Sequence, residues 1–169
     1  TNRLGLSDNS FVVEIASNDG YLLKNFVSSG IPCLGIEPTK STAAAASAIG
    51  IPVRQEFFGK NMGLSMANAG EQADLVLGNN VFAHVPDIND FTEGVAALLK
   101  PNGVVTFEFP HLLQLIQQNQ FDTIYHEHFS YLSLCSVSSI FKAAGLRVFD
   151  VEELKTHGGS LRIYGCRGD

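Results

Sequence analysis

The sequence predicts an α/β fold with a doubly wound, mostly parallel sheet that ends in an antiparallel β-hairpin. Two observations support this prediction. Five short, apolar, β-rich runs alternate with segments of helical periodicity as far as Pro110, as they do in sheets built from β–α–β units. Two further strand-like runs are then joined by the residues KTHGG, and paired glycines are typical of a tight antiparallel turn.

The expected elements follow one another along the whole chain. The strands are expected at residues 11–17, 31–37, 51–58, 73–80, 104–110, 146–154 and 160–167. The helices are expected at residues 20–30, 41–50, 88–100, 111–121 and 136–145, the last of them with Ser136 or Ser138 near its start. Residues 60–70 are a poor helix candidate because Gly63 interrupts them. The PNG sequence at residues 101–103 predicts a turn after the preceding helix.

The composition excludes several classes of function. The 169 residues include 17 acidic and 11 basic ones, for a formal net charge of −6. Because no basic stripe is present, binding through nucleic-acid phosphates is not expected. The three cysteines are scattered and form no CxxC pair, so neither a disulfide framework nor a zinc knuckle is predicted and a cytoplasmic location is expected. No apolar run reaches the roughly 18 residues of a membrane span, so no membrane partner is expected.

Small or acidic residues follow the first expected strand, where a ligand would meet the sheet. In doubly wound sheets ligands bind beyond the carboxyl ends of the strands. This first turn contains the small residues Ala16 and Ser17, the single glycine Gly20, and the acidic residues Glu14 and Asp19. It lacks the G-x-G-x-x-G pattern of dinucleotide sites. Acidic groups repel a phosphate and favour a cationic ligand.

Glu37 ends the second expected strand. Its carboxylate can accept two hydrogen bonds from the vicinal hydroxyls of a ribose. A ribose-binding carboxylate beside a turn that disfavours phosphate predicts a positively charged nucleoside cofactor, and S-adenosylmethionine is such a molecule. For Glu14, hydrogen bonding within the loop remains the alternative role.

The sequence strings around these positions resemble a known family. VVEIASNDGYLL, GIEPT, NNVFAHV and LLKPNGVVTFEFP look like the motifs of class I S-adenosylmethionine-dependent methyltransferases, whose Rossmann-like sheet has a reversed last strand. FDTIYHEHFSYLS and THGGSLRIY narrow the resemblance to the C-methyltransferases that act on nucleotide-linked deoxysugars, across nearly the full length. The first loop departs from the usual glycine-rich methyltransferase pattern.

The resemblance also carries an expectation about domains. Members of this family usually have an N-terminal zinc domain and a C-terminal domain, and this sequence contains neither. The chain begins at Thr1 without Met and stops just after a strand-like run. We therefore expect residues 1–169 to be one S-adenosylmethionine-binding domain excised from a longer protein.

The resemblance implies cofactor-binding roles at specific positions. It places the methionine and ribose against the first turn, the ribose hydroxyls on Glu37, the adenine near the second and third strand ends, and the amino group after the fourth strand. Core packing is the alternative for Phe57 and Phe58. The implied residues are Glu14, Ala16, Ser17, Asn18, Gly20, Glu37, Pro38, Glu56, Phe57, Phe58, Asn79 and Asn80.

The YHEH sequence, Tyr125 to His128, is the candidate reactive group. Methylation of carbon needs a nucleophilic carbon, and a base that removes a proton next to a ketone produces one as an enolate. If the segment is helical, Tyr125 and His128 share one face, whereas in an extended segment Tyr125 shares a side with Glu127 and His126 shares the other with His128. In either case Glu127 is close enough to orient a neighbouring His or to bind a sugar hydroxyl. A zinc or iron site would need three or four converging ligands, with His84 and His111 as the remaining partners. Capping of a helix is the third alternative, and it is the preferred one for His126.

The resemblance assigns roles within this group. It implies His128 as the general base, alone or together with Tyr125, with Glu127 positioning the substrate or base and His84 donating a hydrogen bond to the ketone or enolate oxygen. The expected partner is a nucleotide-sugar, the expected cofactor is S-adenosylmethionine, and no metal is expected. Methylation of oxygen or nitrogen on another small molecule, and a non-catalytic binding module of the same fold, remain alternatives. An NAD-dependent oxidoreductase is disfavoured by the missing glycines.

Overall fold

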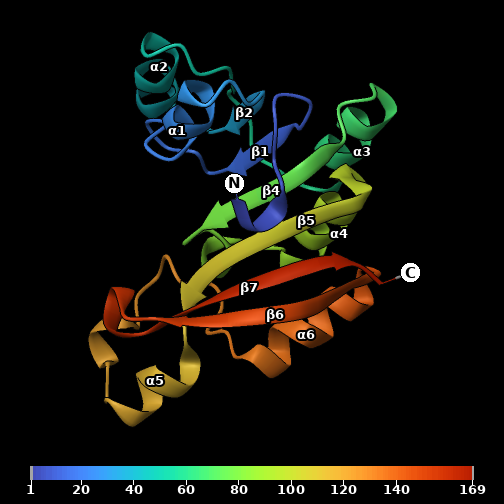
Figure 1. Ribbon diagram of the computed structural model, residues 1–169. Helices are drawn as coiled ribbons and strands as arrows, with labels where there is room; N and C mark the ends of the chain where they lie inside the picture. Colours follow the sequence, from blue (N-terminus) through green and yellow to red (C-terminus); the bar gives the residue numbers. More distant parts are fainter. Residues whose placement is uncertain (1, 169) are drawn as a thin grey trace.

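The computed structural model describes residues 2–168, which form a seven-stranded sheet in the order β3-β2-β1-β4-β5-β7-β6 (Figure 1). The neighbouring pairs among β1 to β5 are parallel, whereas β7 is antiparallel to both β5 and β6. The predicted fold class, including the terminal hairpin, is confirmed. The strands are β1 (Val12–Ile15), β2 (Cys33–Ile36), β3 (Val53–Arg54), β4 (Ala73–Asn79), β5 (Leu99–Pro110), β6 (Leu146–Leu154) and β7 (Ser160–Arg167).

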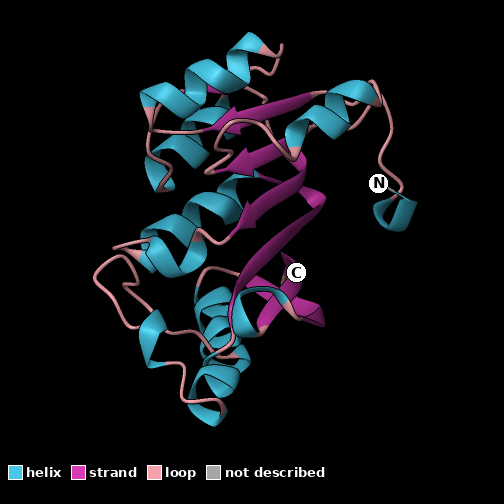
Figure 2. Ribbon diagram, turned by 90° about the vertical axis from the view of Figure 1, so that its left-hand side faces the viewer, coloured by secondary structure: helices cyan, strands magenta, loops and turns pink. Residues whose placement is uncertain are grey.

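Helices connect the parallel strands and pack beside the single layer of strands (Figure 2). The α-helices are α1 (Leu23–Ser28), α2 (Lys40–Ala48), α3 (Lys60–Asn68), α4 (Ile88–Leu98), α5 (Leu112–Gln117) and α6 (Leu134–Ala143). Short 3₁₀ helices are η1 (Asn2–Leu4), η2 (Phe82–His84), η3 (Phe121–Thr123) and η4 (Thr156–Gly158). Helix α6 begins at Leu134, two residues before the predicted start at Ser136. Ser133 is the N-cap, and Ser136 forms a capping box with Ser133.

Two apolar clusters, one on each face of the sheet, stabilise it. The larger cluster joins β1, β2, β4, β5 and β7 to α3, α4 and α6, and stacked or edge-on Phe rings lie at its centre, with Phe82 and Phe107 4.7 Å apart. The smaller cluster packs α1 and α2 against β1, β2 and β4. In Figure 1, α1 and α2 accordingly lie at the β1–β2 end of the sheet, and α5 and α6 at the β6–β7 end.

Residues 60–68 form the helix α3, so the expectation of a poor helix there was wrong. Gly63 lies inside this helix without breaking it. The absence of a side chain at Gly63 lets the backbone of α3 approach α4 closely. A Cβ atom on Gly63 would lie 2.2 Å from the carbonyl oxygen of Gly94, and Gly94 itself lies against Gly59. The close packing of the two helices offsets the low helix propensity of glycine.

Several element boundaries also differ from prediction. The helices expected at 20–30 and 111–121 are shorter, at Leu23–Ser28 and Leu112–Gln117. β5 begins at Leu99, directly after α4, so the PNG sequence lies inside the strand. A register shift between Ala73 and Leu75 on the neighbouring β4 accommodates this irregular start. The third strand is also shorter than predicted, with only Val53 and Arg54 paired to β2.

Among the described residues, none of the helices is both long and apolar enough to cross a membrane.

Candidate cofactor and proton-transfer site

The carboxyl ends of β1, β2 and β4 meet at one edge of the sheet, as the sequence predicted. The first loop leaves this edge in a constrained backbone conformation. Ala16 and Asn18 have φ angles of 57° and 52°, and Asn80 after β4 has a φ angle of 54°. Residues other than glycine rarely adopt this left-handed backbone conformation. It costs about 1–3 kcal/mol and occurs most often at functional sites. The conformation that other loops obtain with glycine is therefore obtained here with Ala and Asn.

Glu37 connects the first loop to the loop after β2. Its two carboxylate oxygens accept hydrogen bonds from the main-chain amides of Thr39 at 2.8 Å and Asn18 at 3.0 Å. Burial alone would raise the pKa of this carboxyl, but the hydrogen bonds from Thr39 and Asn18 outweigh burial and lower it. Glu37 is therefore held as a carboxylate with lone pairs left to accept further hydrogen bonds.

A cavity of about 470 Å³ opens at this edge, lined by Ile36 and Pro38, the two chain neighbours of Glu37, but not by Glu37 itself. Its volume lies within the usual range of small-molecule sites, and its lining is mostly apolar with a few polar groups. Phe57 stands at the rim with 85% of its surface exposed, while Phe58 packs edge-on against Phe91. The cavity is lined by Ile15, Ala16, Ile36, Pro38, Glu56, Phe57, Phe58, Val81, His84, Val85, Pro86, Asp87, Asp90 and Phe91.

Six of the residues singled out in the sequence line this cavity, namely Ala16, Pro38, Glu56, Phe57, Phe58 and His84. Sequence reasoning missed the two aspartates Asp87 and Asp90, which belong to the start of α4. The only sequence signal for these aspartates was their position shortly after the fourth strand. Asp87 could be explained as an ordinary N-cap, because its side chain accepts a hydrogen bond from the amide of Asp90.

Other predicted cofactor residues point away from the cavity. The Glu14 side chain lies on the α1 face of the sheet, 5% exposed, and among residues 2–168 its Oε2 atom has no hydrogen-bond partner. Burial raises its pKa to about 8. The buried Ser17 hydroxyl lies over Gly35 on the same face, and a Cβ on Gly20 would collide with Ile51 at 2.1 Å. Glu14, Ser17 and Gly20 therefore support the first loop by packing on the α1 face of the sheet and do not line the cavity.

The two asparagines after β4 have different environments. Asn79 is the last residue of β4, half-buried on the edge of the sheet. Asn80 donates its main-chain amide to the carbonyl of Glu108 at 2.8 Å. Its side-chain oxygen is buried and, within the described part of the chain, unpaired. Such an oxygen is a ready acceptor for an ammonium group.

The predicted reactive residues come together in a turn. The segment is neither helical nor extended, because the amide of His128 donates to the carbonyl of Tyr125 and brings the two side chains side by side. The Tyr125 hydroxyl lies 3.2 Å from Nε2 of His128. The His84 ring is 4.7 Å from the His128 ring, centroid to centroid. Since His84 lines the cavity, the cluster of Tyr125, His128 and His84 adjoins it.

The main chain determines the tautomer of His128. Its Nδ1 atom lies 2.8 Å from the carbonyl oxygen of Thr123. A carbonyl only accepts hydrogen bonds, so Nδ1 carries the hydrogen and Nε2 is left with its lone pair toward Tyr125. Burial lowers the pKa of His84, and the neighbouring His128 lowers it further. His84 is therefore neutral near pH 7 and can both donate and accept a hydrogen bond.

Glu127 and His126 lie in the same turn but are exposed. His126 makes no side-chain hydrogen bond to the described residues, so the expected helix-capping role is not what the structure shows. Nor does any group of three or more His, Cys, Asp or Glu side chains between residues 2 and 168 have the arrangement of a metal site.

This chain is similar in sequence to known methyltransferases. Residues 1–151 match the methyltransferase domain family. The chain is 42% identical, over 164 residues, to the C-methyltransferase NovU of Streptomyces niveus, covering 97% of this chain but only 39% of that protein. It is also 29% identical over 94 residues to a ubiquinone biosynthesis O-methyltransferase of Rhodopseudomonas palustris, covering 56% of this chain and 37% of that protein.

Solved structures share the same fold. The magnesium protoporphyrin IX methyltransferase of Synechocystis, solved with bound S-adenosylmethionine, superposes with a TM-score of 0.70 at 12% identity, covering 98% of this chain and 72% of that one. An S-adenosylmethionine-dependent methyltransferase from Mesorhizobium loti gives a TM-score of 0.72 at 13% identity, covering 94% and 91% of the two chains. These structures share the fold of this chain, and the family match over residues 1–151 shows that the chain belongs to the methyltransferase domain family.

Proposed function

We propose that this domain methylates a carbon atom of a nucleotide-linked keto-deoxysugar through an enolate. The observation that carries the proposal is the contact between the Tyr125 hydroxyl and Nε2 of His128, next to a cavity-lining His84. The similarity to NovU over nearly the whole chain supports transfer to carbon. Because the chain spans about two fifths of that relative, the substrate of the complete protein belongs to the proposal.

Groups in and next to the cavity support the choice of S-adenosylmethionine as cofactor. The carboxylate of Glu37 has lone pairs for the ribose hydroxyls, and the exposed ring of Phe57 offers a flat apolar surface for the adenine. The unpaired side-chain oxygen of Asn80 can accept from the ammonium group of the methionine part. S-Adenosylmethionine supplies an electrophilic methyl group on a positively charged sulfur.

The residues of the cluster then have distinct roles. With its lone pair free, Nε2 of His128 removes the Tyr125 hydroxyl proton as Tyr125 takes a proton from the carbon next to the ketone, or it takes that proton directly. The C–H electron pair forms the carbon–carbon double bond of the enolate, the C=O π pair moves onto the oxygen, and His84 donates a hydrogen bond to that enolate oxygen. The enolate carbon forms a bond to the methyl carbon, the sulfur–methyl bond breaks, and S-adenosylhomocysteine leaves.

The test separates proton removal from methyl transfer. In the full-length protein, a nucleotide-linked keto-sugar in deuterium oxide is expected to exchange the hydrogen next to its ketone, even without cofactor. His128→Ala should lower both exchange and methylation by about 10²–10⁴-fold, the usual contribution of a general base. His126→Ala is the matched control and should behave as wild type, because His126 is an exposed neighbour in the same turn.

Methylation of an oxygen atom is the competing function, supported by the similarity to ubiquinone biosynthesis O-methyltransferases. A His–Tyr pair could equally deprotonate a hydroxyl group. Methylation without any exchange at carbon would favour that reading over ours. Absence of both reactions, with cofactor binding intact, would indicate a binding module.

A further inference from the structure

The turn between β6 and β7 lies beside α5 and the loop that carries the reactive cluster (Figure 1). This turn contains His157, Gly158 and Gly159, all with positive φ angles. It does not line the cofactor cavity, so the proposed chemistry gives it no direct part. Its hydrogen bonds nevertheless lead to His128.

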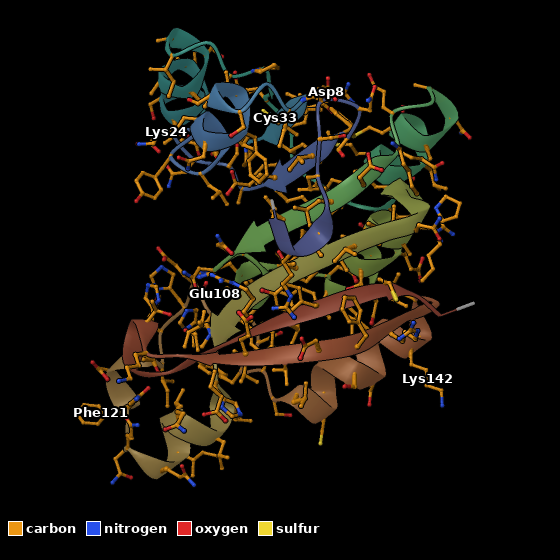
Figure 3. The ribbon with its side chains drawn as sticks, viewed as in Figure 1. Asp8, Lys24, Cys33, Glu108, Phe121 and Lys142 are labelled. Carbon is orange, nitrogen blue, oxygen red and sulfur yellow. The ribbon has the colours of Figure 1, made fainter. Side chains whose placement is uncertain are left out.

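The turn is anchored to the sheet by Glu108, a buried carboxylate on β5 (Figure 3). One oxygen of Glu108 accepts from the Thr156 hydroxyl at 2.9 Å, and the other accepts from Arg162 of β7 at 2.6 Å. A buried carboxylate that is paired on both oxygens holds its partners firmly, because leaving either oxygen unpaired is costly. The turn is therefore fixed relative to the end of β5.

Gln120 ties the fixed turn to the reactive loop. Its side-chain amide donates to the carbonyl of Gly158 at 2.7 Å and to the side-chain oxygen of Gln118 at the same distance. The contact is close-fitting, since a Cβ on Gly158 would lie 2.6 Å from the amide nitrogen of Gln120. Gly158 is thus required for its φ angle of 74° and for the space that Gln120 occupies.

The main chain of Gln120 passes the constraint on to the histidine. Its carbonyl accepts from the amide and the hydroxyl of Thr123, at 3.2 Å and 2.8 Å. The carbonyl of Thr123 in turn accepts from Nδ1 of His128. A series of hydrogen bonds joined by short stretches of the covalent chain therefore connects Glu108, through the turn, Gln120 and Thr123, to the imidazole.

We propose that Gln120, held by the β6–β7 turn, is a positioning residue that keeps His128 in the tautomer with its lone pair toward Tyr125. This inference rests on the proposed function for its effect on rate, but its effect on the tautomer does not. Removing the Gln120 amide frees the η3 turn, so the carbonyl of Thr123 no longer holds Nδ1 and the imidazole reverts toward its other tautomer. Nε2 then carries the hydrogen and cannot accept from Tyr125.

The test compares Gln120→Met with Gln117→Met in the full-length protein. Gln117 is an exposed glutamine at the end of α5 that makes no side-chain hydrogen bond to residues 2–168, so the control makes the same chemical change outside the series. The tautomer of His128 is read from long-range proton–nitrogen NMR correlations of its ring. Methylation is measured as kcat and as KM for S-adenosylmethionine.

Gln120→Met is expected to shift His128 toward the Nε2-protonated form and to lower kcat about 10–100-fold, the effect of a misplaced catalytic group. KM for S-adenosylmethionine should stay unchanged, and Gln117→Met should match wild type. A second pair, Thr156→Val and Thr156→Ser, tests the anchor, because Val removes the hydroxyl donor to Glu108 and Ser restores it. Only the Ser variant should retain the wild-type rate and tautomer.

An unchanged tautomer or an unchanged kcat in Gln120→Met overturns the proposal, as does an equal loss in Gln117→Met. If the wild-type protein does not methylate carbon at all, the proposed function fails. The NMR comparison still decides whether Gln120 positions His128, so the two failures are distinguishable.

Discussion

Glu14 and Glu37 lie at adjoining strands and are almost equally buried, yet their pKa values move in opposite directions. Glu37 has two main-chain amide donors, and these hold it as a carboxylate. Glu14 has no partner for Oε2 within residues 2–168, so burial favours its neutral form. Burial without a compensating donor decides the charge of Glu14, whereas hydrogen-bond donors outweigh a weaker effect of burial at Glu37.

This contrast predicts opposite responses of stability to pH. The folded-state pKa of Glu14 is about 8, above its ordinary value of 4.5. Folded Glu14 therefore holds a proton that the unfolded chain releases, so stability is full below pH 4.5 and is lost as the pH rises toward 8. The loss amounts to about 5 kcal/mol at most, at 1.36 kcal/mol for each pKa unit. Glu14→Gln cannot titrate and should remove this loss.

Urea unfolding of wild type and Glu14→Gln at pH 5, 7 and 9 measures the difference. Equal slopes of stability against pH in the two proteins would contradict the prediction. Glu37→Gln provides the opposite control. The pKa of Glu37 is lowered from 4.5 in the folded state, so its contribution is present above that pH and is lost as the pH falls through the lowered value.

At the scale of elements, the contact between α3 and α4 depends on glycine. Gly63→Ala would gain about 1 kcal/mol of helix propensity. The added Cβ, 2.2 Å from the carbonyl oxygen of Gly94, forces two backbones apart, and overpacking of this kind costs about 1–3 kcal/mol. Because main-chain atoms cannot rotate away as a side chain can, we expect a net loss of stability of about 1–2 kcal/mol.

Thermal unfolding checks this prediction, with Ser65→Ala as the control on the same helix. Ser65 is exposed, so its replacement should change stability by about 0.5 kcal/mol or less. A Gly63→Ala protein that unfolds at or above the wild-type temperature would show that the helices can separate without cost.

The elements that the sequence predicted correctly are those whose signal is local. Apolar β-rich runs and capped helices are visible in a short window, and their alternation predicts the doubly wound fold class. α3 was missed because the reason for Gly63 lies on another helix, thirty-one positions away at Gly94. The early start of β5 was missed because PNG normally makes a turn, whereas here it lies in an irregular strand.

The candidate site divides in the same way. Side chains with distinctive chemistry, such as Glu37, His84, Tyr125 and His128, could be singled out from the sequence. The contribution of Thr123 is a main-chain carbonyl, which every residue possesses, so its identity gave no signal. Gln120 was hidden for a related reason, since its partner is the carbonyl of Gly158 in a turn 38 positions away.

At the scale of the whole molecule, the proposed cofactor cavity predicts that S-adenosylhomocysteine, the product of the proposed reaction, stabilises the folded protein. S-Adenosylhomocysteine at 100 times its dissociation constant should add about 2.7 kcal/mol to the free energy of unfolding. For a protein of this size that corresponds to a rise in Tm of roughly 5–10 °C. Differential scanning fluorimetry measures the shift, with NAD at equal concentration as the control. No shift at millimolar S-adenosylhomocysteine would contradict the assigned cavity.

The position of β7 has a consequence for how the protein is made. β7 follows β6 in the sequence but lies between β5 and β6 in the sheet. Chains leave the ribosome N-terminal end first. A nascent chain that stops before Ser160 therefore has a completed parallel half but an unpaired edge on β5 and no neighbour for β6. Translation of residues 160–167 closes that gap in one step, so a pause just upstream of them would prolong the interval in which chaperones or aggregation compete with folding.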